Sequence, residues 1–150
     1  MKGVGITKSV EIFSILKKEW KEISPMNQKR NKPGVGVVDE KIFVFGGFDD
    51  GQRLKTIEVY SEKTKRWEMM KVTMKTRRSD MGVAVIGDLI FIIGGLNGID
   101  VVEEEVEVMN TKTQTMETLT RNPTGRRGMG VGVVDDRFIW TFGGFDGDKV

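Results

Sequence analysis

The sequence predicts an all-β protein built from a repeated unit of four short strands, and three observations support this. Apolar runs of about five residues recur along the chain, and glycine is unusually frequent, at 19 of 150 residues, against a typical ~7%. These runs lack the three-and-four spacing of apolar residues that marks an amphipathic helix. Because glycine inside a helix costs about 1 kcal/mol relative to alanine, the composition favours tight turns between strands.

A repeat of about 48 residues is the clearest feature of the chain. Its marker is a Gly-Gly doublet after an apolar run, found at Gly46-Gly47, Gly94-Gly95 and Gly143-Gly144. A second apolar run precedes each of these, and a short polar turn separates the two runs, as in a β-hairpin. An arginine lies upstream of every hairpin, again at intervals of 48 residues: Arg30, Arg78 and Arg126. We call the two predicted strands of each hairpin a and b.

The second half of the repeat has a different pattern. After the doublet come an alternating segment (57–60 and 106–109), a polar turn, and then a large residue, Trp67 or Met116. The N-terminal segment 10–13, followed by Trp20, matches this half alone. We name these strands c and d. Strands a and b are almost wholly apolar and are expected to be covered on both faces, whereas the alternation in strand c predicts one less buried face.

The repeat divides the chain into a half unit over 1–25, whole units over 26–73 and 74–121, and a half unit over 122–150. Four strands per unit with this period are typical of a β-propeller blade. Two whole blades and two half-blades amount to three blades with twelve strands, whereas propellers close with four to eight. The sequence therefore predicts an incomplete ring. A piece of a longer propeller is the favoured interpretation, and a ring of two copies or an open arc are the alternatives.

The same residues carry a family resemblance. The doublet after an apolar strand, an aromatic residue about fourteen positions on (Tyr60), and Trp67 seven positions later resemble the kelch repeat. The segments 74–79 and 143–147 are similar to kelch-like proteins that carry BTB and BACK domains. The resemblance implies a kelch-type propeller that binds other proteins. The BTB and BACK modules, which dimerise and bind the cullin scaffold, have no counterpart in these 150 residues.

The expected ligand site lies on one side of the blades. In an antiparallel blade the loop before strand a and the loop after strand b share a face, so the arginines should meet the residues that follow the doublets. Guanidinium groups suit carboxylates and aromatic rings anchor interfaces, which predicts an acidic peptide or protein as ligand. By resemblance, kelch-like propellers hold degrons on this face. The candidate partner-binding residues are Arg30, Arg78, Ser79, Arg126, Arg127, Phe48, Leu96 and Phe145.

A structural interpretation of the same residues stands beside the functional one. The arginines could tie neighbouring blades through a carboxylate such as Asp49, Asp50, Asp80, Asp146 or Asp148. The Gly-Gly doublets are expected to serve backbone geometry at the end of strand b. Blades need bulky fillers, so four aromatic residues are expected in the core: Phe13, Trp20, Tyr60 and Trp67.

Composition excludes several functions. Cysteine and histidine are both absent, which removes disulfides, Cys/His zinc sites and the Ser-His-Asp triad. No metal or cofactor is expected, and an enzyme is the least supported class. A net charge of +2 gives no overall field to attract nucleic acid or a membrane, and no apolar run is long enough to span a bilayer. A cytoplasmic setting fits these features.

The leading functional hypothesis is the substrate-recognition part of a kelch-like adaptor for a cullin-type ubiquitin ligase. The alternative is a cytoskeletal protein, because some kelch proteins bind actin and a basic face could meet the acidic actin surface. A piece of a longer propeller without a function of its own is the remaining interpretation. The partner is thus a protein or an acidic peptide, actin, a second copy, or the rest of a longer propeller.

Overall fold

The structure, a computed structural model that describes residues 5–147, contains β-strands and turns but no helix. Fourteen strands occur among these residues, and twelve of them form two four-stranded sheets and two separate hairpins. All pairings are antiparallel. The all-β, incomplete propeller that the sequence predicts is confirmed. No helix of the described chain could cross a membrane.

The first whole blade has strand order β3-β4-β5-β6. Strands a and b are β3 (Gly34–Val38) and β4 (Lys41–Phe45), and strands c and d are β5 (Ile57–Ser61) and β6 (Arg66–Met69). The turn between β3 and β4 has positive φ at Asp39 and Glu40, a conformation typical of two-residue hairpin turns.

The second whole blade has strand order β8-β9-β11-β12. Its strands are β8 (Gly82–Ile86), β9 (Leu89–Ile93), β11 (Glu105–Asn110) and β12 (Thr115–Arg121). The two short strands β7 (Arg78–Ser79) and β10 (Leu96–Asn97) pair with each other outside the blade.

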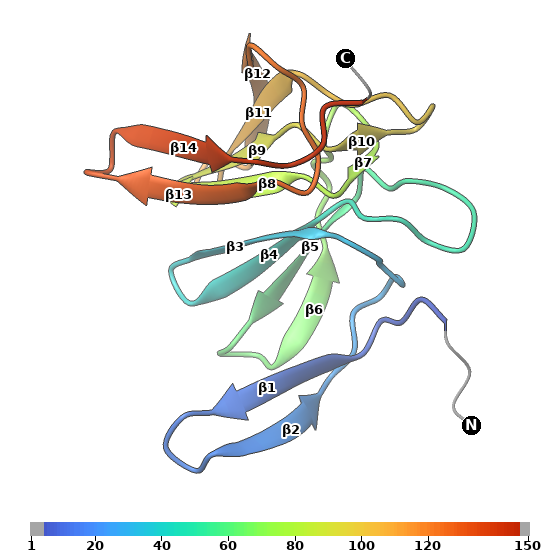
Figure 1. The fold of residues 1–150 in the computed structure, drawn as a ribbon. Helices are drawn as coiled ribbons and strands as arrows, with labels where there is room; N and C mark the ends of the chain where they lie inside the picture. The colour runs from blue at the N-terminus through green and yellow to red at the C-terminus, as the bar shows by residue number, and fades with distance from the viewer. Residues whose placement is uncertain (1–4, 148–150) are drawn as a thin grey trace.

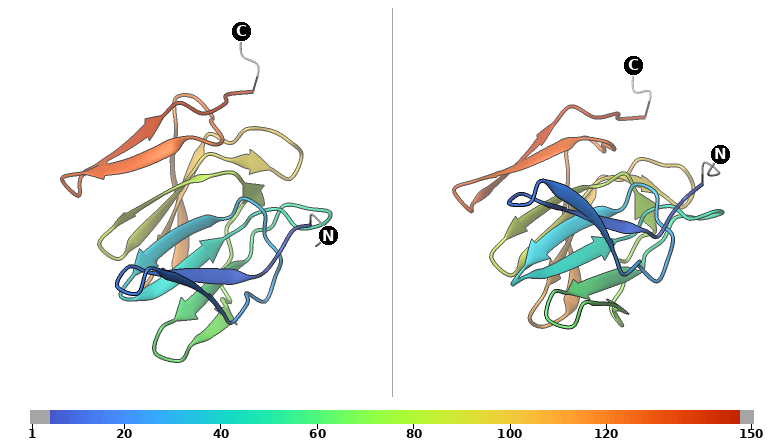
Figure 2. Two further views of the ribbon diagram at one scale, coloured as in Figure 1. Left: turned by 60° about the horizontal axis from the view of Figure 1, so that its bottom comes forward. Right: turned by 90° about the horizontal axis from the view of Figure 1, so that it is seen from below.

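Two hairpins lie at opposite ends of the stack of sheets (Figure 1). At one end β1 (Val10–Ser14) pairs with β2 (Glu19–Ile23), which are strands c and d of a half-blade. At the other end β13 (Gly130–Val134) pairs with β14 (Phe138–Phe142), which are strands a and b. The left view of Figure 2 shows the hairpin β13–β14 (orange), the second blade and the first blade in this order, with the hairpin β1–β2 (blue) in front.

The core lies between the two whole blades, with Phe45, Ile57, Ile90, Ile92 and Met109 among its fully buried members. The innermost strands β3, β8 and β13 pack side by side, and glycines permit this approach. A Cβ at Gly34 would lie 2.6 Å from a methyl of Val83, and a Cβ at Gly82 would lie 2.4 Å from a methyl of Val131. The glycines of strand a therefore let the blades meet near the axis.

One expectation about burial needs refinement and another is wrong. Strand c of the first blade has one less buried face, at Val59 and Ser61, but this is not the charged face, because Glu58 of β5 and Glu107 of β11 are completely buried. The aromatic residues of the first half-blade are not in the core: Phe13 is 47% exposed and Trp20 is 68% exposed, whereas the equivalent Tyr60 is 3% exposed. A half-blade without strands a and b leaves these rings uncovered.

Candidate functional site

The loop before strand a and the loop after strand b meet in each blade, as the sequence predicts. Their backbones pair antiparallel at three equivalent places: Asn31 with Phe48, Ser79 with Leu96, and Arg127 with Phe145. We call the surface made by these paired loops the loop face. It presents to one side the residues that follow all three Gly-Gly doublets.

The Gly-Gly doublets shape this part of the fold. Both glycines of the first doublet have positive φ, +53° at Gly46 and +95° at Gly47, a region that glycine adopts most easily. A Cβ at Gly46 would lie 2.3 Å from the carbonyl oxygen of Arg78, and the N–H of Gly47 donates to that same oxygen over 3.0 Å. The doublet thus joins one blade to the arginine loop of the next.

Arg30 does not face a partner. Its side chain is buried and forms a salt bridge with Glu58, with 3.0 Å between Nη2 and Oε1. Arg30 also donates through Nη1 to the carbonyl oxygens of Gly46 (2.6 Å) and Thr56 (3.1 Å). Burial lowers the pKa of Arg30 from its ordinary value, and the hydrogen bond to Glu58 partly offsets this effect.

Arg78 repeats this arrangement in the second whole blade. It is fully buried, with Nη2 2.5 Å from Oε1 of Glu107 and Nη1 3.0 Å from the carbonyl oxygens of Gly94 and Glu105. The backbone N–H groups of Lys75 and Thr76 donate to the same Glu107 carboxylate. The expectation that Arg30 and Arg78 contact a ligand is therefore corrected, because each guanidinium is enclosed and paired within its own blade.

Ser79 is also withdrawn from solvent. It is buried, and its hydroxyl accepts a hydrogen bond from Nε of Arg53 over 3.1 Å. The exposed cations of the loop face are instead Lys29, Lys32 and Arg77, with Arg127 partly exposed.

Aspartates of the loop face pair with these cations and not with the buried arginines. The carboxylate of Asp80 forms salt bridges with Lys32 (3.1 Å) and Arg127 (3.3 Å). The ammonium group of Lys29 donates a hydrogen bond to the carboxylate of Asp50 over 2.8 Å, and this hydrogen bond raises the pKa of Lys29 from its ordinary value. Among the proposed carboxylates, Asp148 lies outside the described residues.

Two arginine–aromatic pairs lie on the loop face. The guanidinium of Arg127 lies 4.6 Å from the ring centre of Phe145, and that of Arg53 lies 5.7 Å from the ring centre of Phe48. Phe145 is 41% exposed. At the equivalent place between them Leu96 supplies an aliphatic side chain, half-buried. A hollow on this face is lined by Asn31, Lys32, Phe48, Arg53, Ser79, Asp80, Leu96 and Arg127.

Arg126 differs from the other two arginines of the repeat. It donates through Nη1 to the carbonyl oxygen of Gly143 over 3.1 Å, as Arg30 does to Gly46, but its side chain is only half-buried. Within residues 5–147 no carboxylate pairs with Arg126. The strand that carries the glutamate in the whole blades has no counterpart beside β14.

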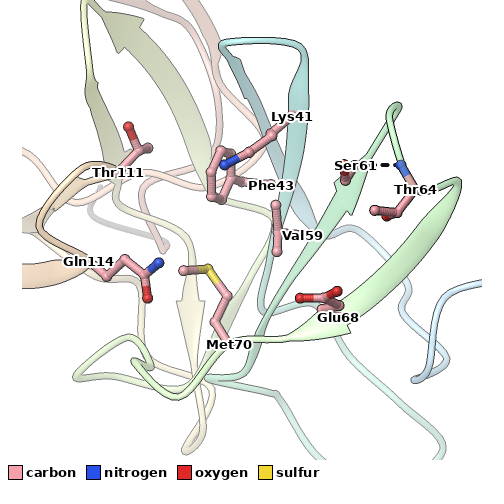
Figure 3. A pocket seen from close by; sticks show the side chains of 9 residues that line it. All are labelled: Lys41, Phe43, Val59, Ser61, Thr64, Glu68, Met70, Thr111 and Gln114. Carbon is pink, nitrogen blue, oxygen red and sulfur yellow. Dashed lines mark hydrogen bonds between the residues drawn. The ribbon is translucent and has the colours of Figure 1, made fainter.

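A second hollow lies between the two whole blades on the side away from the loop face (Figure 3). Its lining side chains come from strands of the first blade, from the β5–β6 turn, from the residue after β6, and from the β11–β12 turn of the second blade: Lys41, Phe43, Val59, Ser61, Thr64, Glu68, Met70, Thr111 and Gln114. They include one cation and one carboxylate and no convergent set of charges. In the described part of the chain, acidic side chains form no group of three that could hold a metal ion.

Sequence reasoning missed Glu58, Glu107 and Arg53. A signal for the glutamates exists, because Glu11, Glu58 and Glu107 occupy the same position in three copies of strand c. A charge repeated within a strand of buried hydrophobic residues indicates a conserved place in the repeat and a buried partner. Arg53 has no such signal, because the loop that contains it differs between the units.

Comparison with known proteins agrees with this architecture. Residues 2–150 match the KLHDC2/KLHL20/DRC7 Kelch-repeats domain. The chain is 34% identical over 79 residues to the Kelch repeat-containing protein kel-10 of Caenorhabditis elegans, covering 53% of this chain and 14% of kel-10. It is 39% identical over 61 residues to Kelch-like protein 40 of Xenopus laevis, covering 41% of this chain and 10% of that protein.

A plant relative shares a segment of similar length. The chain is 38% identical over 60 residues to the F-box/kelch-repeat protein At4g39580 of Arabidopsis thaliana, covering 40% of this chain and 16% of that protein. The chain thus spans only a small part of the length of each of these relatives. With the family match over almost every residue and the repeated blades of the structure, the chain belongs to the kelch-repeat family.

Proposed function

We propose that the chain is a protein-binding module whose loop face recognises an acidic segment of another protein. The observation that carries this proposal is that the aromatic residue directly after a Gly-Gly doublet has an arginine beside its ring in two units: Arg53, from the same loop, beside Phe48, and Arg127, from the loop before strand a, beside Phe145. A ring with a guanidinium beside it offers an apolar platform and a carboxylate receptor together.

Both arginines already form salt bridges with aspartates, so the carboxylates of a ligand would compete with these aspartates. Asp100, the partner of Arg53 at 2.6 Å, has a side chain that is 78% exposed, whereas the side chain of Arg53 is 14% exposed. Arg127 is the more exposed cation, at 32%, and its partner Asp80 is 16% exposed. We therefore expect a ligand carboxylate to approach Arg127 directly and to displace the exposed carboxylate of Asp100 from Arg53.

In the finer form of the proposal, the bound segment belongs to a substrate of a cullin-type ubiquitin ligase. Support comes from the kelch-like resemblance of the loops and from a relative whose name, Kelch repeat and BTB domain-containing protein F47D12.7, joins kelch repeats with a BTB domain. An adaptor role of this kind requires a BTB module elsewhere in the protein. A cytoplasmic location and a binding function without enzymatic activity belong to the same proposal.

An array of acidic peptides, with and without aromatic residues, tests the binding step. Peptides selected on the 150-residue chain are measured again by fluorescence anisotropy with Arg127→Glu and Phe145→Ala. We expect a loss of about tenfold or more for each variant, because a hot-spot contact contributes about 1–2 kcal/mol or more. Arg137→Glu is the matched control: Arg137 also lies over a ring, Phe138, at 5.7 Å, but at the other end of the hairpin.

Equal binding by Arg127→Glu and the wild type would contradict the loop-face proposal. If the selected segment binds as expected, the ligase role is tested in cells by capturing its parent protein and measuring the ubiquitination of that protein with and without Phe145→Ala. Co-sedimentation with actin filaments at physiological salt tests the cytoskeletal alternative. Pelleting that survives Arg127→Glu would assign actin binding to another surface.

A further inference from the structure

The two half-blades each carry one part of an arrangement that both whole blades repeat. In a whole blade the arginine before strand a contacts the first glycine of the doublet and a glutamate on strand c. These trios are Arg30, Gly46 and Glu58 in the first blade and Arg78, Gly94 and Glu107 in the second. The trio requires strand c to lie beside strand b.

The C-terminal half-blade has the arginine and the glycine. Arg126 donates to the carbonyl oxygen of Gly143, and in the described chain β14 pairs only with β13. The free edge of β14 is apolar and uncovered, with Trp140 54% exposed and Phe142 56% exposed. The place of strand c and its glutamate is therefore open at this end.

The N-terminal half-blade has the glutamate. Glu11 of β1 occupies the position of Glu58 in β5 and of Glu107 in β11. Glu11 is exposed, and no described residue forms an ion pair with it. Strand β1 pairs only with β2 in this part of the chain, so its other edge is open. The N-terminal half-blade therefore has the glutamate-bearing strand c that the C-terminal half-blade lacks.

We propose that a second copy of this chain completes the blade at each end, with β1 of one copy pairing with β14 of the other and Glu11 accepting the guanidinium of Arg126. The two ends lie on opposite sides of the stack (Figure 1), so they cannot meet within one chain. Two copies, each with two whole blades and two half-blades, make a closed ring of six blades, within the four to eight of known propellers. The proposal does not depend on the function of the loop face.

The register of the new pair follows from the whole blades. Phe45 pairs with Ile57 and Ile42 pairs with Tyr60 in the first blade, and β9 and β11 repeat this register. Transferred to the joint, Phe142 of one copy lies opposite Val10 of the other, and Ile139 lies opposite Phe13. The exposed rings Phe13 and Trp20 then gain the covering that Tyr60 and Trp67 have.

The backbone around the third doublet is also complementary to the second copy. A Cβ at Gly46 or Gly94 would lie 2.3 Å from the arginine carbonyl oxygen of the next blade, whereas a Cβ at Gly143 meets no atom within 4 Å. The next blade in the proposed ring begins with Arg30 of the second copy. We expect its carbonyl oxygen to accept from the N–H of Gly144, as the carbonyl oxygen of Arg78 accepts from Gly47.

One hydrogen bond of the whole blades is lost at the joint. Glu107 accepts from the backbone N–H groups of Lys75 and Thr76, and the equivalent positions before Arg126 are Pro123 and Thr124. Proline has no N–H, so Glu11 would accept from one backbone N–H, that of Thr124, in addition to the guanidinium of Arg126. The Arg126–Glu11 contact accordingly contributes a larger share of this joint.

Light scattering of the 150-residue chain over a range of concentrations tests the proposal. We expect a species of twice 16.9 kDa. Arg126→Glu and Glu11→Arg should each raise the dissociation constant at least about a thousandfold, because each variant breaks the charge pair at both joints and truncating one partner of an enclosed pair costs about 2–5 kcal/mol. Both side chains are accessible in the single chain, so the variants should keep its circular dichroism spectrum.

Mixing the two variants gives the decisive result. In a mixed pair one joint has Arg126 with Glu11 and the other has the reversed charges, so both are complementary and the paired species should return. Lys17→Glu in the β1–β2 turn, where the side chain is 74% exposed, and Arg137→Glu in the β13–β14 turn are matched controls that should leave pairing unchanged. A wild-type chain that stays at 16.9 kDa throughout, or variants that do not pair on mixing, would overturn the proposal and leave these edges to strands from outside this chain.

Discussion

Replacing Arg78 by methionine tests whether the arginines before strand a hold the blades together or bind a partner. Arg78→Met keeps a long side chain but removes the charge and the hydrogen bonds to Gly94, Glu105 and Glu107. The carboxylate of Glu107 remains fully buried. The variant therefore leaves a charged group enclosed without its cation.

The expected loss of stability follows from this burial. Removing one partner of a buried ion pair costs about 3–5 kcal/mol. The carboxylate of Glu107 keeps two backbone N–H donors, from Lys75 and Thr76, so we expect a value near 3 kcal/mol. For a domain of this size that corresponds to a fall in Tm of about 6–12 °C. It is also a large share of the roughly 5–15 kcal/mol by which domains are stable.

Denaturant unfolding followed by tryptophan fluorescence and circular dichroism measures the loss. Arg77→Met is the matched control, because Arg77 is the exposed neighbour and donates to Gln52 and to the carbonyl oxygen of Arg53. We expect a change within about 0.5 kcal/mol for the control. If Arg78→Met unfolds like the control but loses peptide binding, the structural role assigned to Arg78 is refuted.

Two further predictions concern the doublet and the loop face. Gly46→Ala places a Cβ 2.3 Å from the carbonyl oxygen of Arg78 at a φ of +53°, and it should lower the free energy of unfolding in denaturant by more than about 2 kcal/mol. Gly51→Ala, where a Cβ meets nothing within 4 Å, should change this free energy little. Equal effects of the two variants would contradict the close approach at Gly46. Asp50→Asn should return the raised pKa of Lys29 toward 10.5 in an NMR titration. A raised pKa stabilises the folded state below the unfolded pKa, and the effect is lost as pH rises through the folded pKa. The titration of Lys29 should therefore make stability vary above about pH 10. Variation between about pH 6 and 9 that Asp50→Asn removes would contradict this assignment.

Local patterns in the sequence predicted the strands well, because both signals on which they depend are local. Alternation or continuity of apolar residues reports how many faces of a strand are covered, and turn residues such as Asp39 and Glu40 report where strands reverse. Repetition then predicted that the loops of one blade meet on one face, which the Phe48 and Phe145 pairings confirm. In the second blade Met109 and Met116 occupy the positions of Tyr60 and Trp67, and they pair across strands as those two residues do.

The roles of charged residues were harder to predict. Arg30 and Arg78 look like the exposed members of a loop, because a loop position and a positive charge both suggest contact with solvent. Their burial depends on Glu58 and Glu107, which lie 28 and 29 residues farther along the chain. Each glutamate reaches its arginine only because strand c returns to lie beside strand b. A local sequence pattern does not reveal contacts between residues so far apart in the chain.

Partner-facing roles on the loop face stay a prediction for Arg127, Leu96, Phe48 and Phe145. The structure adds Arg53 to this set, since its guanidinium lies over Phe48. Arg126 belongs to neither group, because its glycine contact is present but no carboxylate of residues 5–147 pairs with it within the same chain. Its role is decided by what covers the edge of β14.

By itself the sequence determined the fold class and the period of the repeat and predicted the division into two whole and two half units, because strand and turn patterns are local and the repeat is visible by comparing segments of the same sequence. Only the tertiary structure decided which arginines are enclosed and which remain free, and why Trp20 is exposed while Tyr60 is buried. Burial depends on what lies beside a residue in space. For the repeat's equivalent positions, that neighbour is present in the whole blades and missing at the two ends.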